Sequence, residues 1–267
     1  MTTRQLNGKT ALVTGASSGV GADIARELAS RGCSVIITAR REERLLALKN
    51  ELESKYAVQV HVIVQDLSAP DAAEALFDQT EGKGLAVDIL VNNAGLAIFG
   101  FYPEVSWQRE RGLYELDIIS VAHLTRTFLQ PMLKRKSGQI LLVASIMGMM
   151  PVPSFSIYAG AKAFVVNYGK SLGYELRNTG VSVTVVSPGT TATEFFEAAG
   201  QPVSYAEKLT MMKSGAVARS AVDAMLKRKP LKVIGFASVF AVVLTKFLPV
   251  WLAVWLTYTM MTLAPKK

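Results

Sequence analysis

The stretch that decides the predicted fold is residues 9–21, Lys-Thr-Ala-Leu-Val-Thr-Gly-Ala-Ser-Ser-Gly-Val-Gly. Its apolar first half is typical of a buried strand, and Val20, Ile24 and Leu28 then recur at helical spacing. In such a unit of strand, turn and helix, glycines let the backbone approach a pyrophosphate, and the helix N-terminus presents unpaired N–H groups. A glycine-rich segment can also be a simple turn, but its place between strand and helix favours a phosphate site.

Outward from this unit, apolar strands and amphipathic helices continue to alternate. The pattern predicts strands at residues 34–38, 58–64, 88–91, 139–145 and 181–187, and helices at 42–56, 70–80, 110–130 and 158–178. Pro131 is expected to end the third of these helices. This alternation predicts an α/β fold, a doubly wound, Rossmann-like parallel sheet with helices on both faces. We expect one dinucleotide-binding and catalytic domain over residues 1–232 and a separate tail over residues 233–267.

The net charge of +8 is concentrated near the C-terminus. Residues 1–206 contain 19 Lys and Arg against 19 Asp and Glu, whereas residues 207–267 contain 10 against 2. Because this basic excess is mixed with a very apolar run and carries no recognisable nucleic-acid motif, we expect a membrane surface as partner and no nucleic acid. The polar first residues and the single cysteine, Cys33, favour a cytoplasmic protein without a signal peptide or an internal disulfide.

The tail itself predicts a monotopic, membrane-associated segment. Between Val233 and Leu263 the only charge is Lys246, and the apolar run at residues 247–263 is shorter than the ~20 residues that a spanning helix needs. Side chains that suit a lipid interface or anionic lipid accompany this run: Trp251, Trp255, Tyr258, Lys227, Arg228, Lys229, Lys266 and Lys267. Burial of the tail in an interface between subunits is the alternative.

Three residues form a candidate catalytic group. Tyr158 and Lys162 are four apart, so on a helix the ammonium lies beside the phenol. A positive neighbour favours the phenolate and lowers the pKa of a tyrosine, which makes Tyr158 a candidate general acid or base. Ser145, at the end of a predicted strand, can offer its hydroxyl to an oxygen held near the tyrosine. Taken alone, the Tyr-x-x-x-Lys spacing also fits a solvated helix start.

The residues after the second strand indicate which nicotinamide cofactor is used. Enzymes that use NAD usually place a carboxylate there, whereas the 2′-phosphate of NADP requires a cation. This chain has Ala39 followed by Arg40, and a guanidinium matches phosphate geometry, so the segment predicts NADP(H). For Arg41 and Arg44 we expect pairing with Glu42 and Glu43 on a solvated helix start.

Five motifs together resemble the compact, single-domain short-chain dehydrogenase/reductase family over roughly residues 7–230. They are Thr14-Gly-x-x-x-Gly-x-Gly21, Asn92-Asn-Ala-Gly95, Ser145, Tyr158-x-x-x-Lys162 and Pro188-Gly-x-x-x-Thr193. The resemblance implies a sheet of about seven strands and hydride transfer between a nicotinamide cofactor and a carbonyl or alcohol. It also implies that Tyr158 is the acid/base, that Ser145 holds the substrate oxygen and that Lys162 binds the nicotinamide ribose.

The resemblance and the motifs supply the expected binding residues. Cofactor contacts are expected from Gly15, Ser17, Ser18, Gly19, Val20, Gly21, Arg40, Asp66, Leu67, Asn92, Ala94, Gly95, Tyr158, Lys162, Pro188, Gly189, Thr191 and Thr193. Substrate contacts are expected from Met147, Val152, Phe155, Phe195 and Phe196. Since this second set is apolar, it suggests a lipophilic carbonyl substrate. No metal site is expected.

One position departs from the family pattern, because Asp117 stands where the family has a catalytic asparagine. We include Asp117 among the catalytic residues and expect it to make activity more dependent on pH. The sequence thus predicts an NADPH-dependent oxidoreductase that reduces a hydrophobic ketone to an alcohol and forms a homo-oligomer, a dimer or tetramer. The alternative is a membrane-associated NADP(H)-binding sensor or scaffold with weak or no catalysis.

Overall fold

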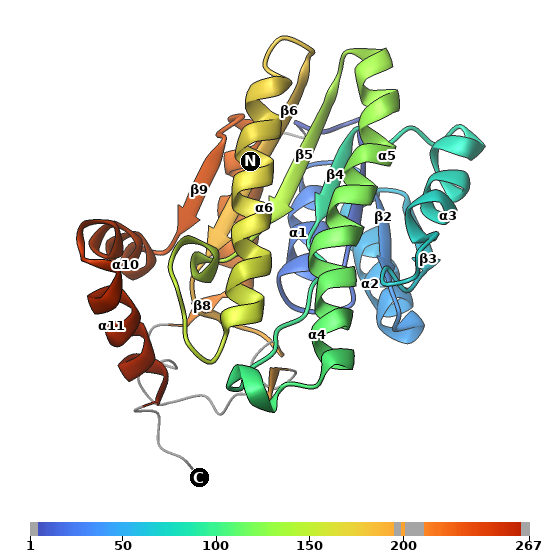
Figure 1. The fold of residues 1–267 in the computed structure, drawn as a ribbon. Helices are drawn as coiled ribbons and strands as arrows, with labels where there is room; N and C mark the ends of the chain where they lie inside the picture. Colours follow the sequence, from blue (N-terminus) through green and yellow to red (C-terminus); the bar gives the residue numbers. More distant parts are fainter. Residues whose placement is uncertain (1–4, 195–198, 201–210, 263–267) are drawn as a thin grey trace.

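The computed structural model describes residues 5–194, 199–200 and 211–262. Within these ranges seven parallel strands form one sheet in the order β3-β2-β1-β4-β5-β6-β9 (Figure 1). The strands are β1 (Thr10–Thr14), β2 (Ser34–Ala39), β3 (Val60–Val64), β4 (Ile89–Asn92), β5 (Gly138–Val143), β6 (Val181–Pro188) and β9 (Leu231–Ile234). A separate pair consists of β7 (Thr191–Ala192) and β8 (Met212–Lys213). The predicted doubly wound α/β fold is confirmed.

The strand order reverses between β1 and β4, which pair directly although β2 and β3 separate them in the sequence. From β1 the sheet continues to β2 and β3, and from β4 it continues to β5, β6 and β9. In an open α/β sheet, such a reversal leaves a crevice outside the carboxyl ends of the strands, because the connections depart to opposite faces. The glycine turn after Thr14 and the Asn-Asn-Ala-Gly segment after β4 therefore meet there.

Two apolar cores lie on opposite faces of the sheet. One is formed with α1 (Gly19–Ser30), α2 (Glu42–Tyr56) and α9 (Ser214–Leu226), and the other with α3 (Ala72–Gln79), α5 (Ser120–Arg135) and α6 (Ser156–Glu175). Successive strand residues face opposite cores, as Ala11 and Val13 do on one side and Leu12 on the other. This burial on both faces is why the strands are almost continuously apolar.

The long helix predicted for residues 110–130 is longer than expected and is interrupted. α4 spans Trp107–Tyr114, a π-helical turn spans Glu115–Ile119, and α5 continues to Arg135. Pro131 does not end the helix, contrary to the prediction. It lies near the C-terminus of α5, where a missing N–H costs only one backbone hydrogen bond. Asp117 lies in the wider π turn and is fully buried.

After β9 the chain forms two more helices, α10 (Phe236–Phe247) and α11 (Val250–Thr262), beside the β9 edge of the sheet (Figure 1). β9 crosses the domain boundary predicted at residue 232. Short 3-10 turns occur at Glu81–Lys83, Tyr102–Glu104 and Ile146–Met149. Among the helices that the structure describes, none is long and apolar enough to cross a membrane.

Candidate active site

The turn after β1 is tied to the end of β4 by Thr14. The hydroxyl of Thr14 donates to the carbonyl of Val91 (3.1 Å) and accepts the N–H groups of Asn93 (2.9 Å) and Ala94 (3.0 Å). The side-chain amide of Asn93 in turn donates to the carbonyl of Thr14 (2.9 Å). These bonds hold the two central strand ends together at the reversal of the sheet.

The glycines of this turn are required by its shape. Gly15 and Gly19 have φ angles of 66° and 56°, in the region that favours glycine. A Cβ at Gly21 would collide with the carbonyl of Gly15 and the side-chain amide of Asn93. Because α1 begins at Gly19, its first backbone N–H groups are available at the same place. The turn thus has the form of a cradle for a phosphate group.

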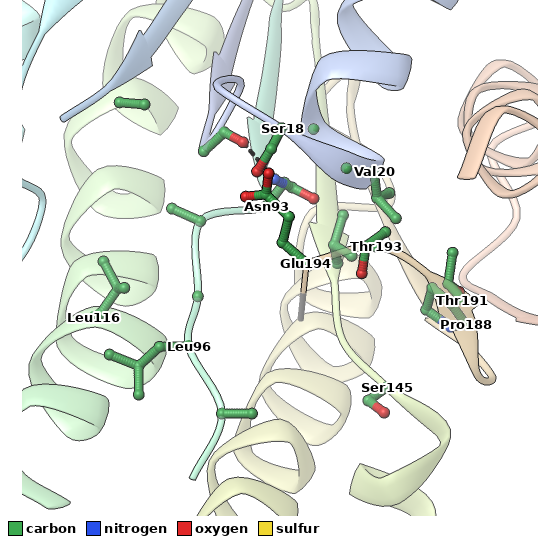
Figure 2. A pocket seen from close by; sticks show the side chains of 18 of the residues that line it. Ser18, Val20, Asn93, Leu96, Leu116, Ser145, Pro188, Thr191, Thr193 and Glu194 are labelled. Atoms are coloured by element: carbon green, nitrogen blue, oxygen red, sulfur yellow. Dashed lines mark hydrogen bonds between the residues drawn. The ribbon is translucent and has the colours of Figure 1, made fainter. Parts of the chain in front are cut away.

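A cavity of about 450 Å³ opens at this end of the sheet, and Figure 2 shows many of the side chains that line it. Its wall includes the glycine turn, Arg40 and Asp66 after β2 and β3, and Tyr158 and Lys162 on α6. Every residue predicted to contact the cofactor lines this cavity except Asn92. Because the cavity joins a phosphate cradle to a pair of titratable groups at the switch point of the sheet, its residues fit a nicotinamide dinucleotide.

Asn92 is the exception, because it does not line the cavity. Its side chain is buried and donates from Nδ2 to the hydroxyl of Thr125 on α5 (2.9 Å). Its neighbour Asn93 lines the cavity instead. Successive residues at a strand end point to opposite sides, so only one of two adjacent asparagines can face the crevice.

The predicted catalytic residues come together at the other end of the cavity. Ser145 follows β5 and accepts the N–H of Met147 (3.2 Å), which caps the short turn after it. Tyr158 and Lys162 lie one helical turn apart on α6, with Nζ of Lys162 5.6 Å from the centre of the Tyr158 ring. All three line the cavity, and Tyr158 and Lys162 are each only 5% exposed.

Asp117 does not line the cavity but lies directly behind Lys162. Its carboxylate is 2.8 Å from Nζ of Lys162 and accepts the N–H of Leu96 (2.8 Å). The ammonium is also 3.4 Å from the carbonyl of Val143. Asp117 therefore acts on the site through Lys162.

Burial has the largest effect on the protonation of Tyr158. It raises the pKa of Tyr158, and although Lys162 and a hydrogen bond with Ser145 favour the phenolate, they do not outweigh burial and the Asp117 carboxylate. Lys162 thus acts in the predicted direction, but the pKa of Tyr158 is raised overall, not lowered. Tyr158 keeps its proton at neutral pH and can donate it.

The pKa values of the buried ion pair follow from the same causes. Burial raises the pKa of Asp117, and its pairing with Lys162 opposes this effect. Burial by itself would lower the pKa of Lys162, but the Asp117 carboxylate reverses this, so that the pKa of Lys162 is raised. The ammonium is therefore held in its charged form beside Tyr158.

The residues predicted to contact the substrate differ in whether they line the cavity. Met147 lines the cavity, whereas Val152 and Phe155 do not and are buried in an apolar cluster with Tyr158. Phe195 and Phe196 lie outside the described residues. Apolar wall residues that the sequence reasoning missed include Leu96, Ala97 and Leu116. Leu96 and Ala97 are the two residues after Gly95, so their positions next to that motif were a usable signal.

The sequence suggested that Arg41 and Arg44 pair with Glu42 and Glu43, but in the structure they pair with a different residue. Both donate to the carboxylate of Glu194, at 2.9 Å from Arg41 and 2.6 Å from Arg44. Arg41 also donates to the hydroxyls of two cavity residues, Ser17 (3.0 Å) and Ser18 (2.7 Å). The labelled side chains of Ser18 and Glu194 lie close together in Figure 2. The carboxylate of Glu194 thus pairs with both arginines at this rim of the cavity.

No group of three or more His, Cys, Asp or Glu residues in the described part of the chain could hold a metal ion. Cys33 is buried, and burial raises the pKa of its thiol to about 12. Since the thiolate is the reactive form, Cys33 is a structural residue.

Residues 9–203 match the protein family described as short chain dehydrogenase. The chain is 39% identical to a short chain dehydrogenase of Pseudocercospora fijiensis over 71% of its own length and 62% of that relative. It is 33% identical to the very-long-chain 3-oxoacyl-CoA reductase of Mus musculus over 70% of its own length and 61% of that relative. The chain therefore spans about three fifths of the length of these two relatives.

Solved structures resemble the whole fold. A short-chain dehydrogenase from Sphingobium yanoikuyae in complex with NADPH superposes with a TM-score of 0.80 at 27% identity, covering 90% of this chain and 96% of that one. A short-chain dehydrogenase/reductase from Burkholderia phymatum in complex with NAD superposes with a TM-score of 0.82 at 26% identity, covering 91% and 94%. The same fold thus accommodates both nicotinamide cofactors.

Proposed function

Because the chain belongs to the short-chain dehydrogenase/reductase family of oxidoreductases, we propose that it uses NADPH to reduce a ketone or related carbonyl group of a hydrophobic substrate. The observation that carries this proposal is the meeting of Ser145, Tyr158 and Lys162 at one end of the cavity, next to apolar wall residues. The proposed reaction is reversible, and its product is the corresponding alcohol.

The proposed roles follow from the chemistry of each side chain. A bound nicotinamide would supply the hydride. As negative charge develops on the carbonyl oxygen, the phenol of Tyr158 donates its proton and the hydroxyl of Ser145 donates a hydrogen bond. The ammonium of Lys162 stabilises the phenolate that remains, because an opposite charge nearby favours the ionised form. Asp117 keeps that ammonium in place and charged.

The residues at the rim of the cavity support a preference for NADPH over NADH. Ala39 offers no carboxylate to a ribose hydroxyl, and Arg40 lines the cavity. Arg41 reaches the hydroxyls of Ser17 and Ser18 and binds a carboxylate there. A 2′-phosphate carries more charge than that carboxylate, so it would compete well for the same guanidinium groups.

A lipophilic substrate is supported by the side chains near Tyr158. Leu96, Ala97, Leu116, Ile146 and Met147 bring apolar surface to the cavity wall. Pockets of this kind favour substrates with few charges. The similarity to a reductase of very-long-chain 3-oxoacyl-CoA points in the same direction.

The direct test is NADPH oxidation measured against a panel of lipophilic ketones, with NADH in parallel. Arg40→Ala and Arg41→Ala should each weaken NADPH binding by about 1.5–3 kcal/mol, the scale of a hydrogen bond to a charged group, and leave NADH binding nearly unchanged. Arg177→Ala, which removes an exposed arginine after α6, is the matched control. Equal losses for both cofactors would contradict a role of these arginines in binding the 2′-phosphate.

The second candidate function is an NADP(H)-binding sensor or scaffold with little catalysis. This second function is favoured by Asp117, which stands where the family pattern has a catalytic asparagine and forms a direct ion pair with Lys162. Stoichiometric NADPH binding without turnover of any ketone in the panel would support this second function over the first.

A further inference from the structure

Both C-terminal helices carry exposed apolar side chains, which together we call the tail surface. On α10, Phe236, Phe240 and Phe247 are 92%, 64% and 84% exposed, and on α11 Trp251 and Trp255 are 72% and 56% exposed. The remaining members are Val239, Val243, Leu244, Val250 and Tyr258. Within each helix these residues, except Val250, recur three or four apart and so share one face.

The opposite face of each helix packs against the protein. Val242 of α10 and Ala253 of α11 are each only 3% exposed. The hydroxyl of Thr257 donates to the carbonyl of Pro151 (2.9 Å). The helices therefore pack on the protein by one face and expose apolar side chains on the other.

The region against which α10 and α11 pack adjoins the active site. Pro151 belongs to the segment between Ser145 and Tyr158, and a Cβ on the cavity residue Gly189 would collide with the side chain of Ser238 on α10. The two helices that carry the tail surface therefore pack next to the wall of the catalytic cavity.

We propose that the tail surface docks on a membrane that contains anionic lipid. Residues 233–267 contain no Asp or Glu, and Lys246, near the end of α10, is exposed. Tryptophan and tyrosine prefer the interface between lipid and water, and lysine is attracted to anionic headgroups. A second copy of this surface is a poorer match for Lys246, because a self-complementary contact would offer it no carboxylate.

The helices lie along the bilayer surface in this arrangement and do not cross it, in keeping with the lengths of the described helices. If the proposed reduction of a lipophilic ketone also holds, the docked enzyme would have its cavity beside the lipid phase that dissolves such a substrate. Membrane docking itself does not depend on that reaction.

Flotation of the full chain with vesicles tests the proposal. Wild type should float with phosphatidylcholine vesicles that contain phosphatidylglycerol and much less with phosphatidylcholine alone. The triple variant Phe240→Ser, Trp251→Ser, Trp255→Ser should lose about tenfold or more in partitioning, and Lys246→Glu should lose less. Leu46→Ser and Tyr174→Ser, which alter exposed residues on α2 and α6, are matched controls and should float like wild type.

Fluorescence gives a second readout, because the chain has three tryptophans. In a Trp107→Phe variant the emission comes only from Trp251 and Trp255. It should shift to shorter wavelength when anionic vesicles are added, since the indole rings then leave water.

Two results would overturn the proposal: wild type that does not float with either vesicle, or a triple variant that floats as well as wild type. Sedimentation that shows a dimer in wild type and a monomer in the triple variant, without vesicle binding, would assign the surface to an interface between subunits. Turnover of a water-soluble ketone, without vesicles, should be unchanged in the triple variant. Loss of turnover in all proteins would reject the proposed function but not the docking.

Discussion

The two ends of the cavity are built by different means. At the cofactor end, the glycine turn is shaped by backbone packing, and a Cβ at Gly21 would collide with its neighbours. At the catalytic end, Tyr158, Lys162 and Asp117 are almost completely buried, and Lys162 and Asp117 form a direct ion pair beside the phenol. The first end is therefore sensitive to the volume of one methyl group, and the second to the position of one proton. Three substitutions test this contrast.

The largest expected effect is at the catalytic end, where Tyr158→Phe removes the proton donor and keeps the ring. The kcat for ketone reduction should fall by roughly 10²–10⁴-fold, the usual contribution of a positioned acid. Binding of NADPH should change little, because the cradle is untouched. Tyr174→Phe, an exposed tyrosine on the same helix, is the control for steady-state kinetics and cofactor titration. A Tyr158→Phe enzyme with wild-type kcat would show that another group donates the proton.

At the cofactor end, Gly21→Ala should act through volume. The added methyl group must displace the Gly15 carbonyl or the Asn93 amide, so we expect a loss of about 1–3 kcal/mol in the free energy of unfolding, together with weaker NADPH binding. Denaturant unfolding and cofactor titration measure the two effects.

Gly112→Ala is the matched control, since a Cβ there meets nothing within 4 Å and the position is helical. It should stabilise the protein by up to about 1 kcal/mol, the difference in helix propensity between the two residues. If both substitutions had the same effect, the turn would not be the tightly packed cradle described above.

The smallest change in maximum rate is expected for Asp117→Asn, whose effect should be on pH dependence. The kcat maximum should stay within about tenfold of wild type, because Tyr158 still donates the proton. Since the Asp117 carboxylate raises the pKa of Tyr158, its loss should move the alkaline fall in ketone reduction to lower pH. The limb of the kcat-against-pH profile that ionisation of Asp117 causes should disappear. Superimposable pH profiles of kcat would place Asp117 outside the catalytic relay.

The stability of the same variant tests the sign of the pKa shift. Because burial raises the pKa of Asp117, the unfolded chain releases this proton at lower pH than the folded protein. The contribution of Asp117 to stability is therefore full below its ordinary pKa and is lost as pH rises through the folded value. Asp117→Asn should abolish this decline in denaturant unfolding measured across that range of pH.

Features that depend on residues close together in the chain could be predicted from local sequence patterns. The unit of β1, glycine turn and α1 was predictable because consecutive residues encode strand, turn and helix. Tyr158 and Lys162 share a helix face because four residues make about one turn. The wall position of Arg40 follows from its place after β2. Each of these inferences needs only local spacing.

Contacts between distant segments could not be predicted in this way, because they depend on how the chain packs. Asn92 and Asn93 are identical in type, and the pairing of β4 with its neighbours selects which one faces the cavity. Arg41 meets Glu194 across 153 residues, which outcompetes the expected local pairing. The raised pKa of Tyr158 likewise arises from burial, which depends on the packing of the whole site. Such contacts are set by how the sheet and helices assemble, and no local pattern in the sequence records them.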